Sequence, residues 1–542
     1  MQIGLGLSIT SQLRFGTALY AVNSFDPDFV LDFKNSYYRK GGSNSTLSGS
    51  VTHARAGNAT MVDSDGLIKW APHNLQRYSE EFNNSTWIKS GASVTANAAT
   101  APNGELLADL LYPTSVGGLI YDLTPKTDPY KISCFVKSAG FSWVALGTNT
   151  NNADVSWFNL GSGVVGTVGS NMSSSSITSI GDGWYLCSTT TTTAVGGNAQ
   201  MAMWPTDGDG SRDSTPNGTD GLYIWGAHCH KSDLGGMANN ASQPTGLETY
   251  VPTATSSAVY LPRVGHHVYN GSAWVNEGIL HESEARTNLL LNSGTLSTQN
   301  VTVSATPYTL SFTGTGTVTL TGVSTAGPLV GTGTGENNRV NLTFTPTAGT
   351  LTLTVSGTVT NAQAEAGSTP SSYIPTSGST VTRAAETLTV PAANLPYSST
   401  NMSIQMSGKM TYADENQNNQ FSLVFWARTT PLINHVMETE GGSGRFEFNQ
   451  RDDTGATDTV ETGGSVISPD INVSFNIASR NGSTFLNGAV NGTALTANTT
   501  PTAMPDLSST DLKLGDLFMG TIAQFRMWDE DLTDAGIAEA ST

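Results

Sequence analysis

The chain has 542 residues, of which 12% are charged, and its formal net charge is −19. No run of Lys or Arg occurs, which argues against a partner recognised through a phosphate backbone. No apolar stretch is long enough to span a bilayer, which argues against membrane insertion.

The composition predicts an all-β protein of several domains. The charged share is about half of the usual value, and 58 glycines accompany abundant Thr, Ser, Asn and Ala. Long helices need Glu, Lys, Arg and Leu, whereas Thr, Val and Tyr separated by Gly, Asn and Asp are typical of short strands. At about 150 residues per domain, the length allows three or four domains.

The N-terminal residues 1–50 are interpreted as a docking arm. The opening sequence MQIGLGLSITSQLRFG has no cationic segment before its apolar part, so we expect no secretory signal peptide. Further along, apolar and polar residues alternate around Phe29, Leu31 and Phe33, which predicts a strand.

Two hairpin linkers are predicted, at residues 51–77 and 261–287. In the first, the short runs 59–62 and 67–70 flank the sequence DSDG, which has the residues of a tight turn. Between the linkers, residues 78–260 are expected to form a jelly-roll-like β-sandwich. Its predicted strands lie at 142–147, 154–161, 183–189, 199–205 and 221–228.

Two further β units are expected after the second linker. Residues 288–383 predict a smaller sandwich, in which Thr alternates with Leu, Val and Phe along 308–322 and 341–357, so that one face of each strand is buried. Residues 384–542 predict a third sandwich with one short helix near its end, capped by Thr533 or Asp534.

An internal repeat relates the two inner sandwiches. The sequence from Tyr250 to Thr253, YVPT, matches the sequence from Tyr373 to Thr376, YIPT, and each lies at the end of its sandwich. The starts also match, because 55–75 and 263–290 both run from Arg through a small strand and a turn to Asn-Leu. We therefore expect an order of hairpin, sandwich, hairpin, sandwich and terminal sandwich.

These sequences resemble modular structural proteins of tailed-bacteriophage virions. The resemblance is carried by LPRVGHHVYNGSAWVNEGILHESEARTNLLLNS, NLQRYSEEFNNSTWIKSGASVTANAATAPNG, AQAEAGSTPSSYIPTSGSTVTRAAE and the N-terminal IGLGLSIT. The last unit, which ends in GTIAQFRMWDEDLTDAGIAEA, resembles the concanavalin A-like or laminin-G-type jelly roll.

The resemblance implies a structural virion protein that projects from the particle as a tail fibre, a spike or a head-attached fibre. It also implies assembly in the host cytoplasm, docking of the N-terminus to other virion proteins, and contact with host surface glycans. A homo-oligomer, expected to be a trimer, would add avidity to weak sites. The alternatives are a capsid decoration or cement protein without receptor binding, and a polysaccharide-degrading tail spike.

The stretch from Tyr260 to Leu290 is unusually rich in ionisable residues, with three histidines and three glutamates. A metal site needs His residues at a spacing that turns them to one point, whereas His266 and His267 are adjacent and would face opposite sides of a strand. We interpret the stretch as a solvated, hydrogen-bonded linker. The competing hypothesis is a metal or acid–base site.

Candidate binding residues lie in loop-rich parts of the 78–260 sandwich. Trp157 and Trp204 are the aromatic rings expected to be exposed and able to stack on a sugar, and the alternative is burial in the core. Asp207, Asp209 and Asp213 alternate in a Gly-bent loop, a pattern that calcium can use, and the alternative is a plain turn. Otherwise we expect no cofactor.

Catalysis has little support in the sequence. No nucleophile elbow, zinc-protease motif or Cys/His pairing occurs, so we expect no enzyme activity. The three cysteines, Cys134, Cys187 and Cys229, are too few for a disulfide framework. Three buried thiols and a single bridge between Cys134 and Cys187 are the two alternatives.

Overall fold

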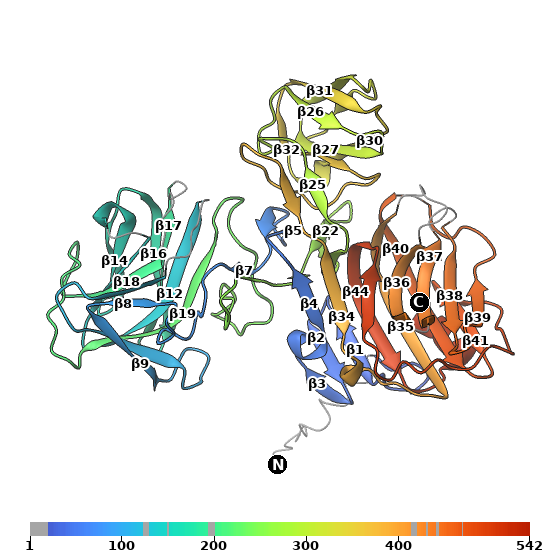
Figure 1. Cartoon of the computed structure of the whole chain (residues 1–542), viewed down its shortest axis with the longest axis horizontal. Coiled ribbons are helices and arrows are strands. Elements are labelled where there is room, and N and C mark those ends of the chain that lie inside the picture. The colour runs from blue at the N-terminus through green and yellow to red at the C-terminus, as the bar shows by residue number, and fades with distance from the viewer. Residues whose placement is uncertain are drawn as a thin grey trace, which may run out of the picture. The chain divides into compact units, whose positions relative to one another are not determined.

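The structure, a computed structural model, describes residues 20–122, 129–148, 151–192, 201–412, 420–429, 432–440, 444–468 and 470–542. The regular secondary structure of the described residues is almost entirely β-strand, which confirms an all-β chain of several β-sandwiches (Figure 1). The chain divides into two compact units, one of residues 69–261 and one of residues 1–68 with 262–542. Each is described by itself.

The unit of residues 69–261 is a sandwich of two six-stranded antiparallel sheets, and it includes the residues 78–260 for which a jelly-roll-like sandwich is expected. One sheet has the order β16-β17-β12-β19-β10-β9 and the other β15-β14-β13-β18-β11-β8. The first holds β9 (Ala92–Ala99), β10 (Ala108–Pro113), β12 (Tyr130–Ala139), β16 (Met172–Gly181), β17 (Trp184–Thr191) and β19 (Gly221–Lys231); the second holds β8 (Ile88–Ser90), β11 (Leu119–Asp122), β13 (Trp143–Gly147), β14 (Val155–Asn159), β15 (Val164–Val168) and β18 (Met201–Thr206).

All three cysteines of this unit are buried thiols. Cys134 on β12 and Cys187 on β17 lie opposite each other in the register of the two strands, yet both remain thiols. Burial raises the pKa of both thiols, because an apolar interior disfavours the charged thiolate. Of the two alternatives, the structure therefore has three buried thiols.

We expect the three thiols to resist alkylation in the folded protein. A buried thiol with a raised pKa is neither accessible nor ionised at neutral pH. A water-soluble thiol reagent should therefore label fewer than one thiol per chain under native conditions and all three after unfolding in guanidinium. Fast labelling of the native chain would contradict the burial of the pair Cys134 and Cys187.

The other unit is built on a large sandwich of two sheets. One has the order β3-β2-β1-β44-β35-β40-β41-β42, with β24 also paired to β44 and β21 to β24; the other has the order β39-β38-β37-β36-β43-β34-β4. The first holds β1 (Phe29–Asp32), β2 (Tyr37–Lys40), β3 (Ser43–Ser45), β21 (Arg263–Val264), β24 (Ile279–Glu282), β35 (Asn401–Tyr412), β40 (Asp470–Gly482), β41 (Leu486–Val490), β42 (Thr493–Ala494) and β44 (Met519–Trp528). The second holds β4 (Thr52–Arg55), β34 (Glu386–Val390), β36 (Gln420–Thr429), β37 (Leu432–Glu440), β38 (Phe446–Arg451), β39 (Thr457–Glu461) and β43 (Leu512–Asp516).

Three separate segments of the chain make this large sandwich. β1 pairs with residues 524–527 of β44, and β24 pairs with residues 519–522 of the same strand. β1 and β24, which are distant in sequence, therefore lie end to end along one edge of β44. Phe29, Leu31, Ile279 and Leu388 are all buried in its single core. The expected third unit, 384–542, is therefore incomplete without residues from both preceding segments.

The arm expected at residues 1–50 is integral to the sandwich over its described part. The strand predicted around Leu31 is β1, and it is buried on both faces as the third strand from the edge of its sheet. The short helix α2 (Leu47–Ser50) follows β3. Residues 1–19, including the N-terminal sequence IGLGLSIT, lie outside the described residues.

Residues 288–383 form a small sandwich with its own core. Its sheets have the orders β26-β31-β28-β29 and β30-β27-β32, and the pair β25-β33 flanks them. The strands are β25 (Arg286–Asn288), β26 (Gln299–Val303), β27 (Tyr308–Gly314), β28 (Thr317–Gly322), β29 (Leu329–Val330), β30 (Val340–Phe344), β31 (Gly349–Ser356), β32 (Val359–Ala366) and β33 (Val381–Arg383). Burial alternates along β28, as predicted, but β27 is buried throughout because it is the central strand of its sheet.

Both predicted hairpin linkers contain a hairpin. The first is β5 (Thr60–Val62) with β6 (Ile68–Trp70), and its turn includes Gly66 at a φ of 77°. The second is β22 (His267–Tyr269) with β23 (Trp274–Asn276). However, β4 before the first hairpin, and β21 and β24 around the second, are strands of the large sandwich.

The helix predicted near the C-terminus is α3 (Thr533–Ala540). The predicted cap is wrong, because Leu532 is the N-cap residue and its side chain makes no capping hydrogen bond. Asp534 lies instead in the first turn and accepts hydrogen bonds from Arg480 Nη1 at 2.7 Å and Asn487 Nδ2 at 2.9 Å. Within the described residues, no helix has the length and apolar content that a membrane span requires.

The repeat seen in the sequence has the same hydrogen bonds in both sandwiches. Ser79 Oγ and Tyr250 Oη are 2.7 Å apart, and Ser293 Oγ and Tyr373 Oη are also 2.7 Å apart. In each case the serine oxygen also accepts a hydrogen bond from a backbone N–H of the YVPT or YIPT sequence at 2.8 Å. These hydrogen bonds of the repeated sequence connect the start of each sandwich to its end.

Candidate functional site

The two tryptophans predicted to contact sugar are buried. Trp157 is 1% exposed and Trp204 is 2% exposed, so the prediction that these rings are exposed is wrong. Trp157 Nε1 donates a hydrogen bond of 2.6 Å to the carbonyl of Ser211, and the Arg212 guanidinium lies 5.5 Å from the centre of the Trp204 ring. The loop after β18 covers both rings, and in this arrangement neither can stack on a sugar.

The aspartates of that loop serve as turn residues. Asp207 accepts hydrogen bonds from the backbone N–H and the hydroxyl of Thr215, and Asp209 accepts one of 2.7 Å from the backbone N–H of Thr167. The carbonyl of Asp213 accepts one from the backbone N–H of Asp207. Across the described part of the chain, no three His, Cys, Asp or Glu side chains are arranged to hold a metal ion, so Asp207, Asp209 and Asp213 do not form the predicted calcium site.

The stretch from Tyr260 to Leu290 is less exposed than predicted, and its charges extend a buried cluster. The side chains of Arg263 and Glu282 are 0% and 3% exposed, so the interpretation of a solvated linker is wrong for these residues. Arg263 and Glu282 both contact Glu386, which follows the small sandwich in sequence. Arg263 Nη2 lies 2.6 Å from Glu386 Oε2. We call this set the ion cluster; its members are His53, Arg55, Arg263, His281, Glu282, Arg383 and Glu386.

The ion cluster connects the three segments that build the large sandwich. Arg55 Nη1 donates a hydrogen bond of 2.5 Å to Glu386 Oε1, and Arg383 Nε lies 3.0 Å from Glu282 Oε2. Arg55 ends the first segment, Arg263 begins the second, and Arg383 lies three residues before Glu386, which begins the third. Because their partners come from other segments, each pair ties distant parts of the sequence together.

The carboxylates of the cluster are held ionised. Burial by itself raises the pKa of Glu282, but the guanidinium groups of Arg383 and Arg263 and the hydrogen bonds from Ser372 outweigh it and lower the pKa to about 2. The pKa of Glu386 is likewise well below its usual range, because Arg263, His53 and Arg55 outweigh the effect of burial. A buried carboxylate with a depressed pKa cannot act as a general acid near neutral pH.

Acid is expected to destabilise the protein through its buried histidines. Burial lowers the pKa of His281 to about 4 and that of His228 to about 3, so both stay neutral when folded. In the unfolded chain each takes up a proton below about pH 6.5, so stability is lost as the pH falls from about 6.5 towards the folded values, by roughly 1.4 kcal/mol per pH unit for each histidine.

Guanidinium unfolding at pH 7.5, 6.0 and 5.0 measures this loss. Since His228 belongs to residues 69–261 and His281 to the other unit, both unfolding transitions should shift in the same direction. A stability that stays constant between pH 7 and 5 would show that these histidines are not buried in the neutral form.

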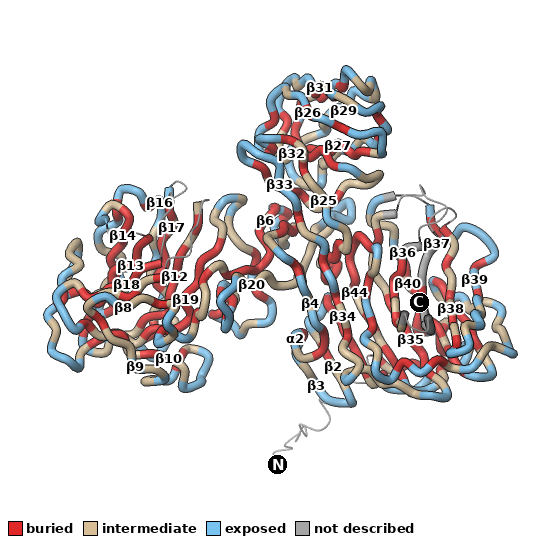
Figure 2. The backbone as a smooth tube through the Cα atoms, viewed as in Figure 1, coloured by how far each residue is buried: buried red, intermediate tan, exposed pale blue. Residues whose placement is uncertain are grey.

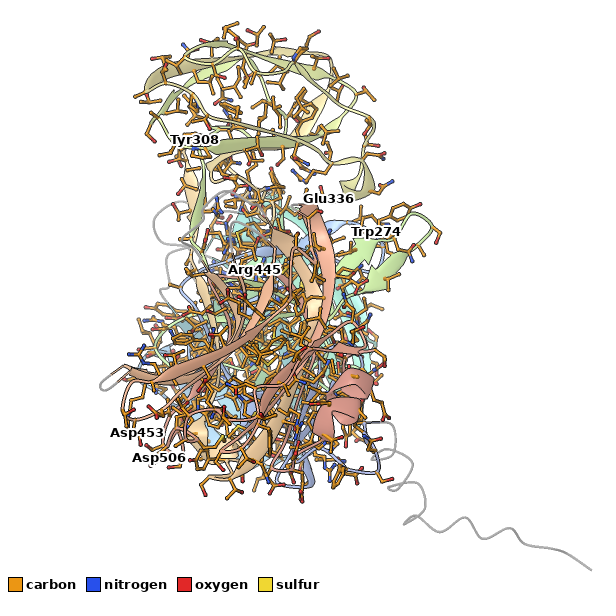
Figure 3. All side chains as sticks on the ribbon, turned by 90° about the vertical axis from the view of Figure 1, so that its right-hand side faces the viewer. Trp274, Tyr308, Glu336, Arg445, Asp453 and Asp506 are labelled. Carbon is orange, nitrogen blue, oxygen red and sulfur yellow. The ribbon has the colours of Figure 1, made fainter. Side chains whose placement is uncertain are left out.

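A cleft of about 300 Å³ lies beside the ion cluster, within the unit that holds the large sandwich. It is bounded by hairpin β22-β23, by the 3₁₀ turn η2 (Glu336–Asn338) and residues 370–373 of the small sandwich, and by residues at the ends of β35, β40 and β44. In Figure 3, Trp274 on the hairpin and Glu336 on the small sandwich mark two of its sides. His266 and His267 both line this cleft. Adjacent residues of one strand were expected to face opposite sides, but His266 precedes the strand, since β22 begins at His267.

The aromatic wall of the cleft is positioned by the two linker hairpins. Tyr269 and Trp274 face each other across β22-β23, with ring centres 5.4 Å apart, and Tyr269 is 37% exposed. Trp274 lies directly against Gly66 in the turn of hairpin β5-β6, where a Cβ would come within 2.2 Å of its Nε1. Only glycine fits this close approach, and its φ of 77° is also one that favours glycine.

The polar walls of the cleft carry amides that have no partner. The side chains of Asn337, Asn341 and Asn472 line the cleft and make no hydrogen bond within the described parts of the chain. Sequence reasoning missed these residues because they come from two sandwiches and nothing in their local sequence distinguishes them from turn asparagines. The sequence signals at this cleft were His266, His267 and Trp274, all in or next to the turn-rich hairpin.

Comparisons with known proteins identify no family. No protein-family model and no curated protein matches the chain. Among solved structures, similar chains include the Ruminococcus gnavus IT-sialidase CBM40, with 14% identity, a TM-score of 0.22 and coverage of 27% of this chain and 84% of that one. The leech intramolecular trans-sialidase has 16% identity, a TM-score of 0.22 and coverage of 27% and 23%.

The receptor binding domain of the botulinum neurotoxin C/D mosaic serotype has 15% identity, a TM-score of 0.24 and coverage of 29% of this chain and 40% of that one. The chain thus spans less than two thirds of the length of the leech and botulinum structures. Similarities with TM-scores this low carry no argument about the function of this chain, which must come from its own residues.

Proposed function

We propose that the chain is a structural component of a bacteriophage virion that projects from the particle and binds host surface glycans without cleaving them. The resemblance of its repeated module ends to modular virion proteins supports the virion assignment. The cleft beside the ion cluster supports glycan binding, and it is the observation on which that part of the proposal rests.

The cleft has the chemistry of a sugar site. Two adjacent aromatic rings, Tyr269 and Trp274, can pack on the apolar face of a sugar ring, and three amides that have no partner among the described residues can exchange hydrogen bonds with hydroxyl groups. A volume of about 300 Å³ lies at the lower end of the range of small-ligand sites. Such a site gives weak single contacts, which several copies on an appendage would turn into avidity.

The carboxylates in the cleft support binding rather than hydrolysis. Glycoside hydrolysis uses one protonated and one ionised carboxyl group that face each other across the substrate. The two glutamates in the lining are each paired with arginine, Glu282 with Arg263 at 2.8 Å and Glu336 with Arg339 at 2.7 Å. Neither is placed as a free proton donor.

Location on the particle and glycan binding test the proposal together. Gold-labelled antibody against the purified chain should mark a projecting appendage, and quantitative mass spectrometry should find a few dozen copies per particle or fewer. The purified chain should bind host surface polysaccharide and release no sugar product. Hundreds of copies spread over the capsid would favour a decoration protein, and release of oligosaccharides would favour a degrading spike.

A further inference from the structure

We infer that the cleft beside the ion cluster selects uncharged glycans, made of neutral hexose or N-acetylhexosamine units, over acidic ones. This inference rests on the proposed glycan binding and names the class of sugar that the same cleft would take. The inference follows from which charged and polar groups of the lining remain available to bind a ligand.

The arginine in the lining is fully engaged. Arg339 donates from Nε and Nη2 to both oxygens of Glu336, at 2.7 and 2.9 Å. Its Nη1 donates to Ser311 Oγ at 3.2 Å and to the carbonyl of Asn361 at 3.0 Å. The face of its guanidinium lies 5.6 Å from the centre of the Tyr373 ring. A carboxylate ligand would have to displace Glu336 to pair with this arginine.

The arginines of the ion cluster do not supply a free cation in place of Arg339. Arg263 and Arg383 lie behind the cleft, with side chains 0% and 1% exposed, and neither is part of the lining. Both are already paired, Arg263 with Glu282 and Glu386, and Arg383 with Glu282. The side chains of Glu336 and Arg339 are 13% and 14% exposed and neutralise each other, so the pair offers an acidic sugar no free counter-ion.

The groups left free are neutral. The amides of Asn337, Asn341 and Asn472 each offer one acceptor and two N–H donors, which match hydroxyl and acetamido groups equally well. An acidic sugar placed among them would lose its hydration without gaining a counter-ion, which is costly. The rings of Tyr269 and Trp274 add contact that does not depend on charge.

A glycan array tests the selection. It should carry neutral hexose and N-acetylhexosamine oligomers beside sialylated and uronic-acid oligomers of matched length, and be probed with the full chain at low and physiological salt. We expect binding to neutral oligomers and at least tenfold weaker binding to acidic ones. Calorimetry with the best-bound neutral oligomer then gives the affinity for each variant.

Matched variants assign the binding to the cleft. Asn341→Ala removes an exposed amide from the lining and should weaken binding of the neutral oligomer at least tenfold. Asn300→Ala removes an exposed asparagine from β26 of the same small sandwich, outside the lining, and should leave the affinity unchanged. Glu336→Gln frees Arg339 and should increase binding of 3′-sialyllactose at least threefold.

The outcomes separate the inference from the proposed function. Preferred binding of acidic oligomers that Asn341→Ala abolishes would overturn the inference and keep the proposed function. Neutral binding that is equal in Asn341→Ala and Asn300→Ala would overturn the assignment to this cleft. No binding to any oligomer or to host polysaccharide would overturn the proposed function itself.

Discussion

Replacing Glu386 with glutamine is expected to lower the free energy of unfolding of the unit that holds the large sandwich by about 3–5 kcal/mol. The side chain is 1% exposed and is the shared partner of Arg55 and Arg263. Glutamine has nearly the same shape but no charge, so the buried guanidinium groups of Arg55 and Arg263 would each lose one ion pair. Removing one partner of a buried ion pair leaves an uncompensated charge, which is why the loss is large.

Differential scanning calorimetry and hydrogen exchange resolved by segment measure this effect. Amides of β21 and β34 should lose protection, while those of residues 69–261 should keep it, because the ion cluster contains no residue of that unit. Glu461→Gln is the control, since its pair with Arg445 at 2.9 Å is 44% and 29% exposed and should contribute less than about 1 kcal/mol. An equally small loss in Glu386→Gln would show that the cluster is not a buried ion network.

Replacing Asn288 or Asn74 with alanine is expected to destabilise one unit at a time, by about 3 kcal/mol each. The two residues occupy equivalent places in the repeat, and both are fully buried. Asn74 Nδ2 donates to the carbonyls of Ala227 and Val251 at 3.0 and 2.7 Å. Asn288 Nδ2 donates to the carbonyls of Ala362 and Ile374 at 3.0 and 2.8 Å.

The side-chain oxygen of each asparagine also accepts two backbone N–H groups. Alanine would leave four buried backbone groups without partners in each case, and that desolvation cost produces the loss. Each variant is the control for the other: Asn74→Ala should shift only the transition of residues 69–261, and Asn288→Ala only that of the other unit. A shift of both transitions in either variant would contradict independent folding of the two units.

The repeat was predictable because it is local in sequence. Tyr250 and Tyr373 stand in matching sequences, and so do Asn74 and Asn288. Their shared hydrogen bonds were not predictable, because they join residues that are more than 70 positions apart. A sequence pattern shows that two segments are alike, whereas a structure is needed to show what each segment binds.

The burial of the charged stretch could not be deduced from the sequence. Arg263 and Glu282 have ordinary local surroundings, and charged residues in a hairpin linker are usually solvated. Their burial depends on Arg55, Arg383 and Glu386, which come from other parts of the chain. The same reason explains the error on Trp157 and Trp204, since the loop that covers them cannot be placed from sequence.

The sequence by itself determined the all-β class, the hairpins, the short C-terminal helix and the kinship of the two inner sandwiches. These features depend on residue composition, period-two alternation and turn residues, which act over a few positions. Only the tertiary structure decided that the large sandwich takes strands from three segments, that the ion cluster is buried, and that Trp274 and three asparagine amides line one cleft. The physical reason is that burial and pairing are set by long-range contacts, and no local pattern encodes which distant residue will supply the partner.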